Sequence, residues 1–354
     1  MEFIKFYLLL LLVTPSAWAR IDLPKFATKL SLDNIRFITA DGRFTYTQKR
    51  SGALTLASSF RGTDIFERPP GTNFYVTSSP ARKKLAIEIE PNWHQDLDLT
   101  KLHEIMVGTY GGSNFLKVGM GRYPRLHLDD DYLTWIDPKE KVIHVQFLKS
   151  TDNHHQIKLS KKHNPFFFSE VVMINPETIL YTDVNDKGYA ALLSWNLLEK
   201  RMTVVKKADV AGTHFELCRR GNYVALGEFS YDDANKGSSI SILAWKDSPN
   251  LAGFSSIYQT SDNDLGQLIC DENKVWFVKT MSEDRKLNIR QTEAVVMDIR
   301  SGQILVKSEL ERVTNIINMD GRILIPFRED IFVAQGDPGS TKDALKPAGR
   351  KAAE

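Results

Sequence analysis

Short runs of apolar and β-branched residues alternate with polar turns along most of the chain. Seven of these runs start at residues 44, 85, 132, 179, 223, 275 and 323. Each follows a tight polar turn, such as Asp41-Gly42-Arg43, and each turn follows another apolar run, such as Ile35-Arg36-Phe37-Ile38. Closely spaced turns between short β-rich runs predict β-hairpins and not helices.

Two further strand-like runs follow each hairpin. In the fourth unit they cover residues 189–195 and 202–205. Four strands in a unit of roughly 45 residues is the blade period of a β-propeller, in which neighbouring blades bury each other's faces. The pattern therefore predicts an all-β fold over residues 20–335, a propeller of seven four-stranded blades. The alternative is six blades, if the second unit, whose turn is the least typical, is misread.

The two ends of the repeat region complement each other. The seventh unit stops after three strands, near residues 331–334, whereas residues 25–30 offer a spare strand before the first unit. We expect this N-terminal strand to complete the last blade and so close the ring. Residues 336–354 are rich in Gly, Pro, Lys and Ala without apolar periodicity, which predicts a disordered C-terminal tail.

The first 19 residues have the pattern of a secretory signal peptide. Lys5 precedes an apolar run over residues 6–13, and the small residues Ala17 and Ala19 flank Trp18. This order predicts cleavage after Ala19. The apolar run is too short to span the ~30 Å hydrocarbon core of a bilayer comfortably, and no later segment is a candidate for a membrane span. We therefore expect a periplasmic or secreted protein.

Two turns carry a resemblance to a known family. Ala40-Asp41-Gly42-Arg43-Phe44-Thr45-Tyr46 and Met319-Asp320-Gly321-Arg322-Ile323-Leu324 resemble the Asp-Gly-Lys/Arg turn and following strand of the WD40-like repeats in TolB-type periplasmic propellers. The other five turns lack Asp-Gly, and the chain has no room for the separate α/β domain of TolB. The resemblance implies the propeller architecture and not the partners of TolB.

The charge balance and the lack of known motifs argue against several classes of function. The 46 Lys and Arg residues nearly balance the 44 Asp and Glu residues, so the sequence lacks the basic excess of a nucleic-acid binder. It has no Gly-x-Ser-x-Gly nucleophile elbow, P-loop, dinucleotide fingerprint or zinc-ligand spacing. We assign no catalytic residue and no cofactor, and we expect a monomer.

The two cysteines, Cys218 and Cys270, occupy equivalent positions at the ends of the first strands of adjacent units. They could form one disulfide in an oxidising compartment. We favour two buried thiols, because blades diverge from the axis and equivalent Cα atoms would then exceed the ~7 Å limit for bridging.

Loops between second and third strands share a propeller face with the connections between blades, and function in such folds concentrates on long loops. Residues 91–100, 230–238 and 281–287 are polar insertions of this kind. The candidate binding residues on that face are Trp93, His94, Asp96, Arg122, Tyr123, His163, His214, Tyr231, Asp232 and Arg285.

Calcium is the metal to consider, because two segments bring oxygen ligands together. They are represented by Asp183, Asn185 and Asp186, and by Asp262 and Asp264. Neither segment completes an EF-hand loop, and both have the composition of ordinary hairpin turns.

Two function hypotheses remain at this stage. The first is an exported scaffold that binds a protein or envelope component through one propeller face. The second is a hydrolase or lyase acting on a carbohydrate or peptide at the channel mouth. An enzyme needs ionisable groups that converge in a pocket, whereas a scaffold needs an accessible binding face.

Overall fold

A computed structural model gives the architecture. It describes residues 35–38, 44–48, 54–58, 63–68, 73–78, 83–90, 98, 100–109, 114–150, 152–163, 170–185, 187–230, 237–246, 251, 253–260, 265–271, 273–284, 289–311, 317–319, 322–327 and 330–333, with most side chains between residues 77 and 305. These residues form strands and turns, and no helix occurs among them. The expected all-β class is confirmed.

The strands follow the predicted units in order. The first unit contains β1 (Ile35–Ile38), β2 (Phe44–Gln48), β3 (Leu54–Ser58) and β4 (Thr63–Arg68). The second and third contain β5 (Asn73–Ser78), β6 (Lys84–Glu90), β7 (His103–Thr109), β8 (Phe115–His127), β9 (Tyr132–Asp137), β10 (Val142–Phe147) and β11 (His154–Lys158). The fourth contains β12 (Val171–Asn175), β13 (Thr178–Val184), β14 (Ala190–Asn196) and β15 (Arg201–Lys207).

The remaining strands complete three more units. The fifth contains β16 (Thr213–Arg220), β17 (Tyr223–Ser230), β18 (Ser238–Ala244) and β19 (Ser255–Thr260). The sixth contains β20 (Leu265–Asp271), β21 (Lys274–Asp284), β22 (Ile289–Asp298) and β23 (Ile304–Glu311). The seventh contains β24 (Ile317–Met319), β25 (Arg322–Phe327) and β26 (Asp330–Val333). All seven runs predicted as second strands are the second strands of their blades.

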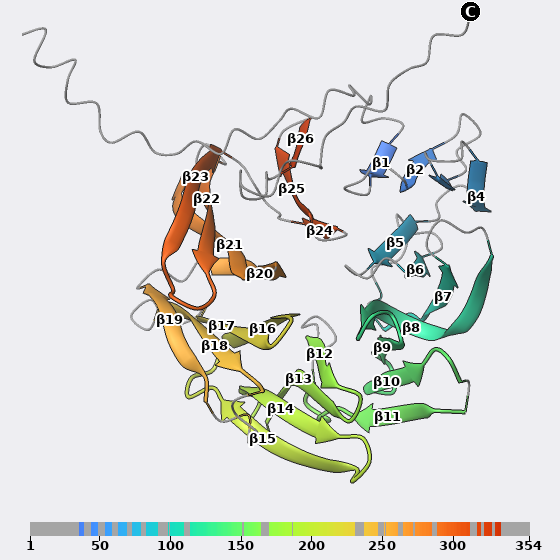
Figure 1. Cartoon of the computed structure of the whole chain (residues 1–354), viewed down its shortest axis with the longest axis horizontal. Coiled ribbons are helices and arrows are strands. Elements are labelled where there is room, and N and C mark those ends of the chain that lie inside the picture. The colour runs from blue at the N-terminus through green and yellow to red at the C-terminus, as the bar shows by residue number, and fades with distance from the viewer. Residues whose placement is uncertain are drawn as a thin grey trace, which may run out of the picture.

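Each blade is an antiparallel meander, and the blades succeed one another around a ring (Figure 1). In that view β12, β16, β20 and β24 lie nearest the centre, and the last sheet returns beside the first. The last blade has three described strands, as predicted. The strand expected to complete it, residues 25–30, lies outside the described residues, as do the signal peptide with Ala17 and Ala19, and the tail.

Blades 2 and 3 are continuous through β8, which the sequence did not predict. The 13-residue β8 pairs with β7 through Phe115–Gly121 and with β9 through Arg122–His127, so the two blades form one seven-stranded sheet. The candidate binding residues Arg122 and Tyr123 lie inside this strand and not in a loop. β8 changes partners between Gly121 and Arg122, and Pro124 stands at the register shift that follows, between Arg122 and Arg125. A residue without an N–H is tolerated at such an irregularity.

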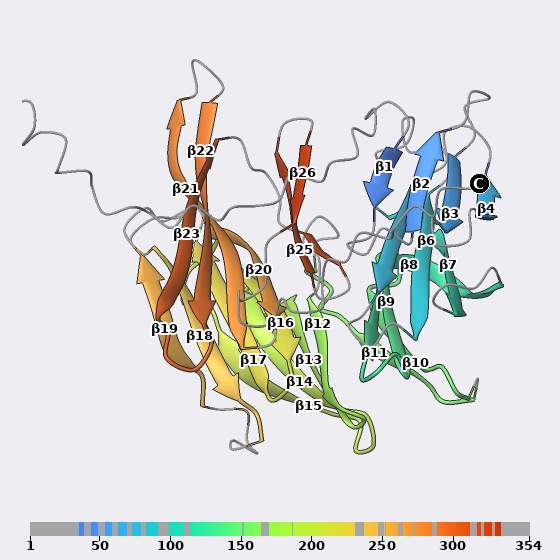
Figure 2. The same cartoon turned by 45° about the horizontal axis from the view of Figure 1, so that its top comes forward.

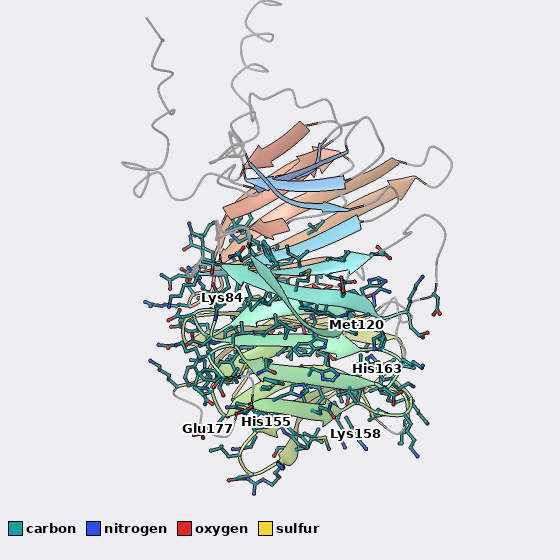
Figure 3. The ribbon with its side chains drawn as sticks, turned by 90° about the vertical axis from the view of Figure 1, so that its right-hand side faces the viewer. Lys84, Met120, His155, Lys158, His163 and Glu177 are labelled. Carbon is teal, nitrogen blue, oxygen red and sulfur yellow. A yellow bond between two sulfur atoms is a disulfide. The ribbon has the colours of Figure 1, made fainter. Side chains whose placement is uncertain are left out.

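The turns gather on two opposite faces, because strands of successive blades run side by side (Figure 2). We call the side with the connections between blades and between second and third strands the loop face, and the opposite side the turn face. In the edge-on view of Figure 3, Met120, Lys158 and His163 lie toward the loop face, whereas Lys84 and Glu177 lie toward the turn face. Most residues of the predicted insertions 91–100 and 230–238 lie outside the described residues, so their role on the loop face stays a prediction. Residues 281–284, predicted as part of a third insertion, belong instead to the strand β21.

The hydrophobic core lies between blades. One cluster joins Ile143 and Val145 of blade 3 to Met173 and Tyr181 of blade 4. Three other clusters join blades 2 and 3, blades 4 and 5, and blades 5 and 6 in the same way. In the part of the propeller whose side chains are described, blades 2 to 6 therefore bury their apolar faces against their neighbours, as expected of a repeat that depends on stacking for stability.

We expect Gly121→Ala to destabilise the protein by about 1–3 kcal/mol through overpacking. A Cβ on Gly121 would lie 2.4 Å from Trp135 Cδ1 and 2.6 Å from the Ile136 carbonyl oxygen, and the backbone atom cannot rotate away. Urea unfolding measures the effect. Leu116→Ala, at an exposed position of the same strand, should change stability by no more than about 0.5 kcal/mol. Equal effects for both variants would contradict the packing argument.

Candidate functional site on the loop face

The structure describes four of the ten predicted binding residues: Arg122, Tyr123, His163 and His214. The other six, Trp93, His94, Asp96, Tyr231, Asp232 and Arg285, lie outside the described residues, in the connections β6–β7, β17–β18 and β21–β22. These connections all join second to third strands. The four described residues do not form one site: Arg122 and Tyr123 share one cluster on β8, His163 lies in the connection before blade 4, and His214 lies in blade 5.

Arg122 and Tyr123 belong to a buried ionic cluster at the loop-face end of blade 2. Glu88 Oε1 lies 2.6 Å from His103 Nδ1 and 3.4 Å from Arg122 Nε. The second Glu88 oxygen accepts the backbone N–H of Tyr123 at 2.8 Å. Glu88, His103 and Arg122 are 1%, 2% and 5% exposed. Glu90 extends the cluster, 3.8 Å from Arg122 Nη2 and 3.9 Å from His103 Nε2.

This cluster holds β8 in place where it leaves blade 2. Tyr123 has a φ of 58°, an unfavourable left-handed conformation for a bulky residue. The hydrogen bond from its N–H to Glu88 fixes that conformation, and the Arg122 guanidinium lies 5.2 Å from the centre of the Tyr123 ring. Burial raises the pKa of Tyr123 to about 12, with Arg122 opposing the shift and Glu88 and Glu90 adding to it. The phenol is therefore neutral at ordinary pH. The contacts of this cluster hold β8 in position where it leaves blade 2.

The sequence analysis missed Glu88, Glu90 and His103. The sequence contains one indication of this cluster: two glutamates at alternate positions of the otherwise apolar run Lys84-Leu85-Ala86-Ile87-Glu88-Ile89-Glu90. Carboxylates on the inward side of a buried strand need partners of opposite charge. The sequence does not show which residues those partners are.

His163 is buried against Asp183 before blade 4. Its Nδ1 lies 3.1 Å from Asp183 Oδ1, and the other Asp183 oxygen accepts the backbone N–H of Ser160 at 2.7 Å. Asn185 caps its own turn by accepting the N–H groups of Lys187 and Tyr189. These contacts give Asp183 and Asn185 roles within the loop.

The expectation of no cofactor stays a prediction, and so do the two segments named as calcium candidates. Asp186, Asp262 and Asp264 lie outside the described residues, and within the described ones no group of three or more His, Cys, Asp or Glu side chains is placed to hold a metal.

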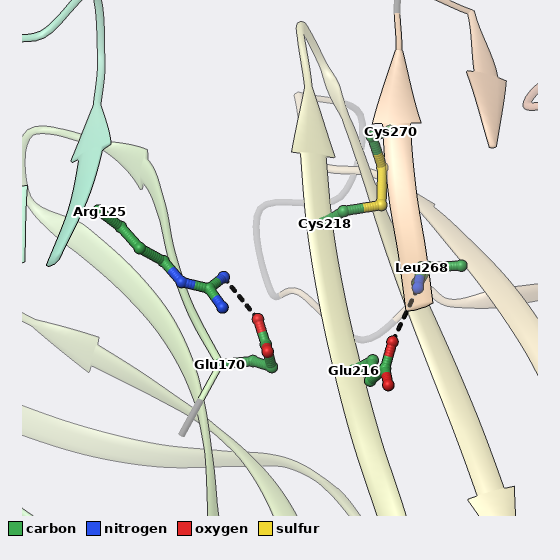
Figure 4. The surroundings of a disulfide bond; sticks show 6 residues. All are labelled: Arg125, Glu170, Glu216, Cys218, Leu268 and Cys270. Carbon is green, nitrogen blue, oxygen red and sulfur yellow. Dashed lines mark hydrogen bonds and ion pairs between the residues drawn. A yellow bond between two sulfur atoms is a disulfide. The ribbon is translucent and has the colours of Figure 1, made fainter. Parts of the chain in front are cut away.

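Near the axis, polar and covalent bonds link blade 3 to blade 4 and blade 5 to blade 6 (Figure 4). Arg125 Nη1 lies 2.5 Å from Glu170 Oε2, which joins blade 3 to the start of blade 4. Glu216 on β16 accepts the backbone N–H of Leu268 on β20 at 2.7 Å. His214 Nε2 is 3.9 Å from the other Glu216 oxygen, and burial lowers the pKa of His214 while Glu170 opposes the shift. The carboxylates nearest His214 are thus engaged in contacts between blades.

Cys218 and Cys270 form a disulfide between the same two strands, with their Cα atoms 5.4 Å apart. The preference for two free thiols was therefore wrong. Blades do diverge outward, but both cysteines lie on innermost strands, where neighbouring blades are closest, and the hydrogen bond from Leu268 to Glu216 holds β20 against β16. The disulfide bridges blades 5 and 6 across 52 residues of sequence.

Because of the surroundings of His127, on the innermost part of β8, we expect the folded protein to lose stability in acid. Burial, together with the nearby positive charges of Arg125 and Arg219, lowers the pKa of His127 to about 3. The folded state therefore resists protonation that the unfolded chain accepts below about pH 6.5, so stability from this group falls as pH drops from 6.5 toward 3, by up to about 1.4 kcal/mol per unit. Urea unfolding between pH 7 and 4 should show a shallower dependence for His127→Gln. An unchanged pH dependence would contradict the assignment.

A second feature of the loop face was also missed, a polar pocket of about 250 Å³ between blades 4 and 5. Its lining includes Lys206, Asp209, Thr213, Glu228, Ser238 and Gln259. Lys206 Nζ lies 2.6 Å from Glu228 Oε2, so the pocket contains an ion pair that joins the outer strand of blade 4 to blade 5. These residues lie near the ends of five strands, β15 to β19, and in the connection between β15 and β16. No local sequence pattern predicts that they line one pocket.

Among the described residues, no helix is long and apolar enough to be a membrane span. No family model matches the sequence, and no curated protein is similar enough in sequence to match it.

Solved structures show the likeness in fold. The β-propeller domain of the Trilobed protease from Pyrococcus furiosus superimposes with a TM-score of 0.55 at 12% identity, over 86% of this chain and 93% of that one. A prolyl endopeptidase gives 0.53 at 10% identity over 82% of this chain, which corresponds to only 46% of the peptidase. TolB from Acinetobacter baumannii gives 0.44 at 11% identity, over 82% and 79% of the two chains.

Identities this low show the fold alone, and no role of these proteins is carried over from them. The β-propeller domain of the Trilobed protease agrees with the four-stranded antiparallel blades described above. By architecture, this chain is a β-propeller.

Proposed function

We propose that the chain is an exported scaffold that binds a protein or a cell-envelope component through the loop face of its propeller. The observation that carries this proposal is the use of ionisable groups on the inner strands. Arg125, Glu170 and Glu216 are engaged in bonds between blades, and Asp183 holds the connection into blade 4. Ionisable groups that bond one blade to the next stabilise the propeller, and a stable propeller can present its loop face to a partner.

The alternative of a hydrolase or lyase at the channel mouth is less well supported. Such an enzyme needs an acid and a base that converge on a substrate, with pKa values pushed apart. In the described part of the propeller, the Glu216 carboxylate lies near His214 and already binds the Leu268 N–H. The Trilobed protease and prolyl endopeptidase share the fold only, so their names do not favour peptidase activity here.

Export is part of the proposal. The N-terminal pattern ending in Ala17 and Ala19 supports it, and so does the Cys218–Cys270 disulfide, since disulfides persist in oxidising compartments. We expect mature protein recovered from the periplasm or culture medium to begin at Arg20, by mass spectrometry of the intact chain. A mature chain that retains residues 1–19 would contradict export with cleavage.

Crosslinking in the native cell envelope, followed by mass spectrometry, tests the binding role. The expected result is reproducible capture of one component by the wild type and its loss in the double variant Trp93→Ala, His94→Ala. Leu198→Ala is the matched control, because Leu198 is 69% exposed in the β14–β15 turn on the opposite face. Capture that survives the double variant but fails in the control would place binding on the wrong face.

A further inference from the structure

The pocket between blades 4 and 5 contains two buried hydroxyl groups to which no described residue is hydrogen-bonded. Thr213, at the start of β16, is 9% exposed, and Ser238, at the start of β18, is 2% exposed. Within the described part of the chain, Thr213 Oγ1 and Ser238 Oγ make no hydrogen bond. Buried polar atoms in folded proteins almost always have partners, so two such atoms lining one pocket point to a ligand that supplies them.

The remaining polar groups define the chemistry of that ligand. Lys206 offers a cation, Glu228 and Asp209 offer carboxylates, and Gln259 offers an amide with both donor and acceptor atoms. Because Lys206 and Glu228 already pair at 2.6 Å, no single charge dominates the pocket. An ionic ligand would meet groups of its own sign beside groups of the opposite sign.

A ligand hydroxyl suits this set better than an ion or an apolar group. Each hydroxyl donates one hydrogen bond and accepts others, so a ring of hydroxyls can donate to the carboxylates and accept from Lys206, Thr213 and Ser238. A volume of about 250 Å³ accommodates one sugar ring. We propose that this pocket binds a single neutral sugar residue, with Thr213 and Ser238 as specific hydrogen-bonding partners.

This inference goes beyond the proposed scaffold role and does not depend on it. It concerns the purified protein and a small ligand, so it can fail while a partner still binds the loop face. Conversely, sugar binding would stand if no envelope protein were captured.

Saturation-transfer difference NMR on the purified mature protein tests the proposal. The probes are glucose, galactose and N-acetylglucosamine as neutral sugars, with glucuronic acid and glucosamine as charged comparisons. We expect a signal from at least one neutral sugar and weaker signals from its charged counterparts. No signal from any neutral sugar, or a stronger signal from a charged one, would overturn the proposal.

Two substitutions assign the binding to the pocket. In the double variant Thr213→Val, Ser238→Ala, the shape is nearly kept and both hydroxyls are removed. Affinity for the neutral sugar should fall at least 10-fold, whereas Thr203→Val, at an exposed position of β15 outside the pocket, should bind as the wild type does. Affinity retained by the double variant would overturn the assignment.

Stability in the absence of sugar separates a binding role from a structural one. Removing a buried hydroxyl that has no partner relieves an unfavourable burial, so the double variant should melt at the same or a higher temperature than the wild type. A melting temperature lowered by several degrees would show that the hydroxyls have structural partners, which would also overturn the proposal.

Discussion

Glu88→Gln is expected to lower the free energy of unfolding by about 3–5 kcal/mol, the usual loss when one partner of a buried ionic group is removed. Glu88 is 1% exposed and accepts contacts from His103, Arg122 and the Tyr123 N–H. A glutamine has the same size, but its NH₂ group replaces one acceptor with a donor that faces another donor. Urea unfolding of the wild type and the variant measures the difference.

The matched control is Glu104→Gln on the neighbouring strand β7. Glu104 lies 3.2 Å from Lys117, but both side chains are substantially exposed, and exposed pairs contribute less than about 1 kcal/mol. A loss for Glu88→Gln no larger than the loss for Glu104→Gln would contradict the view that the buried cluster fixes β8 between blades 2 and 3.

Loss of the disulfide should have the second large effect. A bridge across 52 residues restricts the unfolded chain, and such bridges typically contribute about 2–4 kcal/mol. The double variant Cys218→Ser, Cys270→Ser should therefore unfold at lower denaturant, and reductant should shift the wild type in the same direction.

Reductant added to the double variant serves as the control, because it should have no further effect. Thiol titration of unreduced native protein provides an independent check. Two titratable thiols in protein purified from the cell envelope would show that the bridge does not form there, and would weaken the case for an oxidising compartment.

The blade pattern could be predicted from sequence because it depends on local alternation. Each second strand, such as residues 223–226 in β17 or 275–278 in β21, is an apolar run after a polar turn. The continuous β8 was not predicted, because Gly121 and Pro124 are typical of loops. Their place in a strand follows from the change of partner between blades, which is a tertiary feature.

The polar interior could not be predicted to the same extent. Cys218 and Cys270 were assigned to equivalent positions correctly, yet whether they bond depends on how closely two inner strands approach near the axis. Glu88 meets Arg122 across 34 residues of sequence, and Thr213 meets Ser238 in one pocket from two different strands. Contacts of this kind depend on how the strands are arranged in three dimensions. They cannot be deduced from local sequence patterns.

The central claim is that one face of the propeller binds an envelope component. The most direct test is a photo-crosslinking residue introduced in place of Lys162 or Gln259 on the loop face, and of Glu177 or Leu198 on the turn face, in living cells. All four positions are exposed. We predict a specific crosslinked species from the loop-face positions only. Equal crosslinking from both faces, or crosslinking from the turn face alone, would contradict the claim.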